Sequence, residues 1–290
     1  MSMTSKVDSP MGIDCAEPRA PWALSAPPPF PAAAMRIMSI LANQDNIAMK
    51  TVVECIQADP VFAAEVLRVA NSALFGSLQD IKTIQRAVVI LGLDFVKALA
   101  ITVGMRAYVR TPLRVPVLRS CWNHSVATAL LSRELARVCG VRGEEAYTAG
   151  LLHDLGRIGL MASYPTEYAN MLSVSYEHSF DVLQCERDLF DLDHCQAGGW
   201  LADEWGLPPD IAFAVEHHHD EISAEPLAIP GIVALGCRLA DTLGFNVVGA
   251  RCTWSLEDIR GSLPKSAQDR FPADAESLKA RVAAQLAGIA

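Results

Sequence analysis

The chain is predicted to be all-α, because from residue 33 onward apolar residues recur every three or four positions and strand-like alternation is nearly absent. Val61, Leu67 and Ala70 follow this helical spacing, and the Asp59-Pro60 pair before them is typical of a helix start. The expected helices span residues 34–41, 49–58, 61–72, 83–92, 94–109, 117–139, 144–163, 165–175, 181–189, 194–204, 209–218, 229–243 and 275–287.

Prolines and changes of pattern divide the chain into four parts. Seven of the 17 prolines fall before residue 32, so residues 1–32 are expected to form a flexible, Pro-rich leader. The segment Arg110–Pro116 is expected to join two helical lobes, residues 33–115 and residues 116–245. Residues 246–290 have weaker patterning and are expected to form a C-terminal helical extension.

Composition narrows the location and the partners of the protein. The most apolar stretch, Val88–Met105, contains Asp94 and Lys97, which indicates a buried helix pair rather than a membrane span. A net charge of −9 argues against binding to duplex nucleic acid, which favours a basic face. The eight cysteines form no C-x-x-C pair, and the N-terminal residues include no apolar signal region, so a reducing, cytoplasmic location is expected.

Six of the seven histidines occupy suggestive positions in the second lobe, and helical phase predicts where several of them point. His124, His194 and His218 each share an apolar stripe that should pack inward, and Asp241 does the same on its own helix. A carboxylate on such a face costs several kcal/mol, to order of magnitude, unless it is paired or binds a cation. These positions therefore indicate a polar cluster inside the second lobe.

Imidazole and carboxylate groups together suit divalent transition metals. His153 and Asp154 are adjacent, about 100° apart around a helix, so both can reach one cleft and the carboxylate could bridge two cations. Two simpler interpretations stay open: an inward histidine can be a hydrogen-bonded core residue, and the run His217–His219 can be a solvated helix end.

The order of these residues resembles the HD superfamily of metal-dependent phosphohydrolases, and the first lobe resembles the HDOD family, the HD-related output domain of bacterial signalling proteins. The matching motifs are Asp59-Pro60, Val66–Gly76, Ala87–Gly92, Ala149–Arg157 and Trp205–Pro208, together with His194, Gly198, His218 and His219. They cover roughly residues 34 to 243. The resemblance implies an all-helical fold in which an N-terminal lobe packs on an HD-type lobe.

By the superfamily pattern, the metal-ligand positions are His124, His153, Asp154, His194, His218, His219 and Asp241. The resemblance implies one or two divalent cations (iron, manganese or zinc) and a regulatory role exerted through signalling proteins. In the alternative function, a phosphohydrolase acting on a nucleotide or other phosphoester, Asp154 and Arg157 would serve catalysis. Asp220-Glu221-Ile222 follows the His pair where HD-GYP enzymes carry Gly-Tyr-Pro, so hydrolysis of cyclic di-GMP is not expected. A third possibility is metal or nucleotide binding without turnover.

Overall fold

The structure, a computed structural model, describes residues 21–25, 29–42, 49–72, 81–220, 227–247, 254–272 and 274–289. Within these residues the regular structure is entirely helical, which confirms the all-α prediction. The elements are η1 (Trp22–Leu24), α1 (Ala32–Ala42), α2 (Met49–Gln57), α3 (Pro60–Ala70), α4 (Ile84–Leu91), α5 (Leu93–Tyr108), η3 (Pro112–Arg114), α6 (Pro116–Cys139), α7 (Gly143–Leu152), α8 (Leu155–Ser163), α9 (Pro165–His178), α10 (Val182–Phe190), α11 (His194–Glu204), α12 (Pro209–His217), α13 (Ile229–Thr242), α14 (Leu256–Gly261), α15 (Lys265–Gln268) and α16 (Ala275–Ile289).

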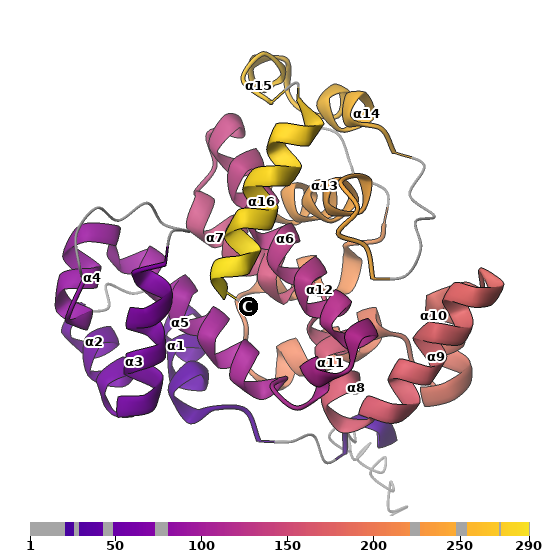
Figure 1. Cartoon of the computed structure of the whole chain (residues 1–290), viewed down its shortest axis with the longest axis horizontal. Coiled ribbons are helices and arrows are strands. Elements are labelled where there is room, and N and C mark those ends of the chain that lie inside the picture. Colours follow the sequence, from indigo (N-terminus) through magenta and orange to yellow (C-terminus); the bar gives the residue numbers. More distant parts are fainter. Residues whose placement is uncertain are drawn as a thin grey trace, which may run out of the picture.

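Helices α1–α5 form the first lobe, drawn in indigo and purple on one side of Figure 1. The Asp59 side chain caps α3 by accepting the backbone N–H groups of Val61 and Phe62, as the sequence predicts. Gly92 adopts a φ of 91°, which ends α4 and starts α5 in a new direction. The apolar stretch around it is therefore two buried helices. Among the described helices, none combines the length and apolarity that crossing a bilayer requires.

The first lobe packs on the second through α5 and α7. The Thr102 hydroxyl on α5 lies 3.0 Å from the Tyr147 hydroxyl on α7, and both side chains are buried. Phe30 packs between Tyr108 and Trp205, with ring centroids 5.1 and 4.7 Å away, so the segment before α1 also spans both lobes. The two lobes consequently share one continuous hydrophobic core.

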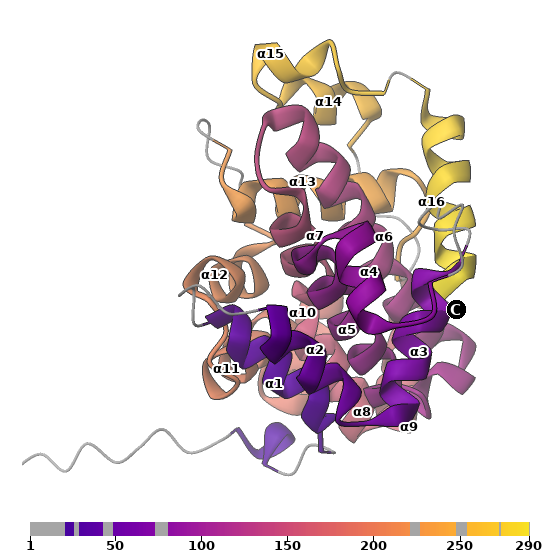
Figure 2. The same cartoon turned by 90° about the vertical axis from the view of Figure 1, so that its left-hand side faces the viewer.

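The second lobe is built around α6, which α7 and α13 flank in both views (Figures 1 and 2). Helices α8 and α11 cross at Gly156 and Gly198, where a side chain on Gly156 would overlap the backbone of α11 at His194 and Gly198. Glycine is required here because it lets the two backbones approach closely. This crossing brings the start of α11 next to the start of α8.

The structure corrects the single helix predicted over residues 144–163. The chain instead forms α7 and α8, with a break at His153 and Asp154, where Asp154 has φ −94° and ψ 28°. Apolar residues continue through the break, because residues 146–161 are buried on all sides of both helices, and so the pattern alone does not reveal it. The break turns the two side chains into the centre of the lobe.

The expected flexible leader is also corrected, at residues 21–25. Trp22–Leu24 form the short helix η1, in which Ala23 and Leu24 are buried against the second lobe. The Trp22 indole N–H donates to the Asp191 carboxylate at 2.7 Å, and its ring packs on Tyr164. A proline count does not predict this contact, because it depends on the apolar triplet Trp22–Leu24 meeting a partner surface. Residues 1–20 and 26–28 lie outside the described residues.

In the extension after residue 245, the described residues 254–272 and 274–289 contain α14, α15 and α16, which pack on the second lobe. Helix α16 lies against α6 in both views, and α14 contacts α13 (Figures 1 and 2). The buried residues of α16 are Leu278, Val282 and Ile289. The short helices α14 and α15 were not predicted from the sequence.

Candidate metal centre

Four separate helix ends and one helix interior bring the predicted site residues together. His124 lies within α6, His153 and Asp154 lie at the break between α7 and α8, and His194 is the first residue of α11. His218 and His219 directly follow α12. Residues from five elements thus meet in the second lobe, and all but His219 are almost fully buried.

Backbone carbonyl groups fix the orientation of three of the imidazole rings. The Nδ1 atoms of His124, His153 and His218 lie 2.9, 2.7 and 2.9 Å from the carbonyl oxygens of Phe245, Gly150 and Val215, respectively. A carbonyl oxygen only accepts hydrogen bonds, so each Nδ1 carries the proton. In the neutral ring the Nε2 atom then bears a free lone pair, which is the form that binds metals.

These lone pairs face one another across a short gap. The Nε2 atoms of His124 and His153 lie 3.3 Å apart, although neither has a proton to donate to the other. Burial lowers the pKa of His153 well below its ordinary value, which keeps this ring neutral. His218 Nε2 is buried without a hydrogen-bond partner. An arrangement of buried acceptors without donors is costly unless a cation lies between them.

Asp154 lies between two groups of histidines. Its Oδ1 atom is 3.4 Å from His194 Nε2 and 3.5 Å from His218 Nε2, and it has no hydrogen-bond partner. Its Oδ2 atom is 3.7 Å from His153 Nε2 and 4.0 Å from His124 Nε2. Burial alone would raise the pKa of this carboxyl, but Arg157 together with the neighbouring His153, His218 and His194 outweighs burial and holds the pKa well below its ordinary value. Each carboxylate oxygen therefore faces a different pair of histidines.

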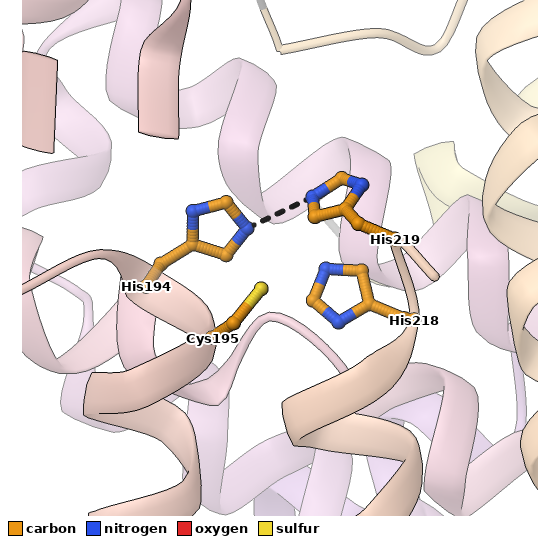
Figure 3. Close-up of side chains that lie close together, drawn as sticks. All are labelled: His194, Cys195, His218 and His219. Atoms are coloured by element: carbon orange, nitrogen blue, oxygen red, sulfur yellow. Dashed lines mark hydrogen bonds between the residues drawn. The ribbon is translucent and has the colours of Figure 1, made fainter. Parts of the chain in front are cut away.

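His194 and His219 form the outer part of the cluster. Figure 3 shows their rings facing each other through Nε2 atoms 3.1 Å apart, with the Cys195 sulfur and the His218 ring beside them. His194 Nδ1 lies 2.6 Å from a carboxylate oxygen of Glu186 on α10, which also accepts the His194 backbone N–H. A carboxylate behind an imidazole is the usual outer partner of a metal-binding histidine.

Glu186 was not among the predicted residues, and it contacts both His194 and Arg157. Its carboxylate also accepts the Tyr168 hydroxyl and lies 3.8 Å from Arg157. Burial would raise the pKa of Glu186, but His194 and Arg157 lower it to about 2. No sequence signal marks Glu186, because its role depends on how α10 packs beside α11.

Arg157 is buried and points into the cluster. Its Nε atom donates to Asp154 Oδ2 at 3.1 Å, and one terminal nitrogen lies 3.1 Å from His194 Nε2. Asp154 and Glu186 place two buried carboxylates beside this one guanidinium. The donor types, the unpaired acceptors and the buried carboxylates all fit a divalent cation.

Asp241 and His217 lie outside the groups of possible metal ligands that the structure brings together. Asp241 approaches His124 from the Nδ1 side, at 3.5 Å, and its side chain is 31% exposed. Among the described residues, the groups whose ligand atoms lie within 4.8 Å of one another are His124 with His153 and Cys237, His153 with Asp154 and His218, and His194 with Cys195, His218 and His219. His217 faces Asp220 instead. Neither Cys195 nor Cys237 was predicted as a site residue, although Cys237 shares the apolar stripe of Asp241.

A cavity of about 280 Å³ opens onto the cluster. Arg157, Asp154 and His219 are among its polar lining residues, and Phe180, Val182 and Leu183 are among its apolar ones. Pockets of this size admit small ligands. A small molecule with a charged group could therefore reach the polar cluster from outside.

The chain belongs to the HDOD domain family, which matches residues 28–221. An HDOD domain protein of unknown function from Geobacter sulfurreducens has a crystal structure with a TM-score of 0.69 and 26% identity, covering 91% of both chains. A Shewanella amazonensis SB2B protein named "Putative phosphohydrolase" has a TM-score of 0.67 and 26% identity over 93% of this chain and 98% of its own. An uncharacterized Treponema pallidum (strain Nichols) protein is 25% identical over 195 residues; the match covers 67% of this chain and 37% of that relative.

Proposed function

We propose that this protein is a bacterial signal-transduction protein whose second lobe binds one or two divalent cations. The observation that carries the proposal is the convergence of unprotonated Nε2 atoms on Asp154, with each Nδ1 of His124, His153 and His218 committed to a carbonyl. Membership of the HDOD family supports the regulatory role. Signalling proteins as partners and a cytoplasmic location remain predictions.

The residues divide into two ligand sets that share one carboxylate. His124, His153 and Asp154 would hold one cation, and His194, His218 and His219 would hold the second, with Asp154 between them. Nitrogen and oxygen donors of this kind suit iron, manganese or zinc. Such a site can report a metal or a bound anion by changing how α7, α8, α11 and α12 pack.

Elemental analysis of the purified protein tests this proposal directly. We expect stoichiometric iron, manganese or zinc in the wild type and its loss in Asp154→Ala. Asp210→Ala, an exposed aspartate in the same lobe, is the matched control and should retain the metal. A wild type that is folded, that is free of metal as purified and that takes up none on incubation with these ions contradicts the proposal.

A second candidate function is a metal-dependent phosphohydrolase, and the cavity over the cluster favours it. A divalent cation lowers the pKa of a water molecule and so supplies a nucleophile at neutral pH. Arg157, at the cavity wall, can pair with a phosphate group. The test is a phosphoester screen with the metal-loaded wild type, with Asp154→Ala as the negative control. Release of phosphate or nucleotide that depends on both metal and Asp154 supports it. Cyclic di-GMP is not an expected substrate.

A further inference from the structure

We propose that the Cys237 thiolate is a direct ligand of the cation held by His124 and His153. The inference rests on the proposed metal binding and deepens it, because it replaces an expected carboxylate ligand, Asp241, by a sulfur ligand. Cys237 lies on α13, one helical turn before Asp241, and is 4% exposed. Its position follows from the fold, since α13 packs along α6 and turns this residue toward His124.

The distances among the three side chains fit a tetrahedral metal site. His124 Nε2 lies 3.5 Å from Cys237 Sγ and 3.3 Å from His153 Nε2, and the three ligand atoms lie within 4.8 Å of one another. Zinc–nitrogen bonds of about 2.0–2.1 Å and zinc–sulfur bonds of about 2.3 Å, at tetrahedral angles, place two nitrogens about 3.3 Å apart and a nitrogen and a sulfur about 3.6 Å apart. Both observed separations match these values.

A hydrogen bond from the thiol to His124 accounts for only one of these contacts. The thiol has one proton, whereas the Nε2 atoms of His124 and His153 both bear lone pairs directed at the same space. A cation satisfies the facing lone pairs together, and a single proton does not.

Asp241 lies on the other side of His124 from this ligand set. Its carboxylate is 3.5 Å from the Nδ1 atom of His124, on the opposite edge of the ring from Cys237. The Nδ1 proton is donated to the Phe245 carbonyl at 2.9 Å, so that carbonyl orients the imidazole. Asp154 Oδ2 is the nearest remaining donor, 3.7 Å from His153 Nε2 and 4.0 Å from His124 Nε2, and completes a set of two nitrogens, one sulfur and one oxygen.

A sulfur ligand changes which metal the site selects. Thiolates favour zinc and other softer ions, whereas sites made only of imidazole and carboxylate also suit manganese. Binding converts the Cys237 thiol to a thiolate, so one S–H bond is replaced by one metal–sulfur bond and the proton passes to solvent. We therefore expect this cation position to prefer zinc over manganese.

Cobalt(II) substitution tests the assignment spectroscopically. A cobalt–thiolate bond gives a strong near-ultraviolet charge-transfer band that nitrogen and oxygen ligands do not give. We expect this band in the cobalt-loaded wild type and at least a several-fold loss of its intensity per bound cobalt in Cys237→Ser. Cys121→Ser, a buried thiol that contacts the Val117 carbonyl, is the matched control and should keep the band.

The outcomes separate this inference from the proposed function. Cobalt that binds without a thiolate band, or a band that survives in Cys237→Ser but is lost in Cys195→Ser, overturns the role of Cys237 and leaves metal binding intact. A wild type that binds no divalent metal overturns both. X-ray absorption of zinc-loaded Cys195→Ser gives an independent check: a sulfur at about 2.3 Å supports the inference, and a shell of only nitrogen and oxygen contradicts it.

Discussion

His153 and His218 occupy equivalent positions on two different helices. Each directly follows the last residue of its helix, α7 or α12, and each places its Nδ1 atom at hydrogen-bond distance from the carbonyl oxygen three residues earlier. The ring thereby satisfies a carbonyl that the helix end would leave unpaired. Their ring centroids lie 4.8 Å apart. The same side-chain cap therefore occurs at the ends of two helices, and it directs both Nε2 atoms toward Asp154.

Substitutions of His153 should separate capping from metal binding. In His153→Asn the amide can still donate to the Gly150 carbonyl, so we expect the free energy of unfolding to stay within about 1 kcal/mol of the wild type. In His153→Ala the buried carbonyl loses its partner, at a cost of about 1–3 kcal/mol. Both variants should bind zinc at least about tenfold more weakly, because one ligand is gone. Denaturant unfolding and zinc titration measure the two effects; equal stability of the variants would contradict the capping role.

The metal-free protein should lose stability in acid because of Glu186. Its pKa is lowered from an ordinary 4.5 to about 2, so its contribution is fully present above about pH 5 and is lost as the pH falls toward 2. The contribution is roughly 3 kcal/mol. Glu186→Gln should therefore unfold with a shallower pH dependence below pH 5, and Glu177→Gln, an exposed control on α9, should match the wild type. Unfolding curves recorded with a chelator at several pH values test this expectation; identical slopes would contradict it.

The crossing of α8 and α11 should not tolerate a side chain at Gly156. Because its Cβ would overlap backbone atoms of α11, Gly156→Ala must push the two helices apart. We expect a loss of at least about 3 kcal/mol in stability, together with reduced metal content, since Asp154 and His194 move apart. Gly261→Ala is the control: nothing lies within 4 Å of its added Cβ, and its melting temperature should be unchanged or slightly higher. A fully metallated, stable Gly156→Ala protein would refute the requirement.

The contact of η1 with the second lobe can be divided into a packing part and a hydrogen-bond part. Trp22→Phe retains most of the ring contact with Tyr164 and Phe190 but removes the N–H that donates to Asp191. We expect it to cost about 0.5–1.5 kcal/mol, and Trp22→Ala to cost more, because the aromatic contact is also lost. Limited proteolysis between residues 21 and 31 should accelerate in the same order. Unchanged cleavage in Trp22→Ala would show that the contact does not hold this segment.

The helical architecture was predictable because amphipathic periodicity and capping residues act locally. Asp59 before Pro60, Thr83 at the start of α4 and Asp193 before His194 each accept backbone N–H groups where the sequence places a helix start. The break at His153 and Asp154 was not predictable from periodicity, because α7 and α8 are both buried on nearly all sides. The packed η1 was missed for a related reason: its partner surface, from Tyr164 to Asp191, is distant in sequence.

The histidines of the candidate centre were predictable in kind but not in grouping. Helical phase placed His124, His194 and His218 inward, and the structure buries all three. Asp241 and Cys237 share one stripe of α13, and helical phase does not specify which edge of the His124 ring each residue approaches. In the structure Asp241 lies at the Nδ1 edge and Cys237 at the Nε2 edge. This difference depends on the tilt of α13 against α6. Glu186 required the tertiary packing of α10.

Helix α7 has a contact between the lobes near its middle and the candidate centre at its end. Tyr147, which is hydrogen-bonded to Thr102 of the first lobe, precedes His153 by six residues, or about 9 Å along the helix axis. A rigid helix cannot shift at one of these points without shifting at the other. A partner that displaces α5 would therefore alter the distance between His153 and the other ligands, and a cation drawn between those ligands would in turn set the angle at which the two lobes meet.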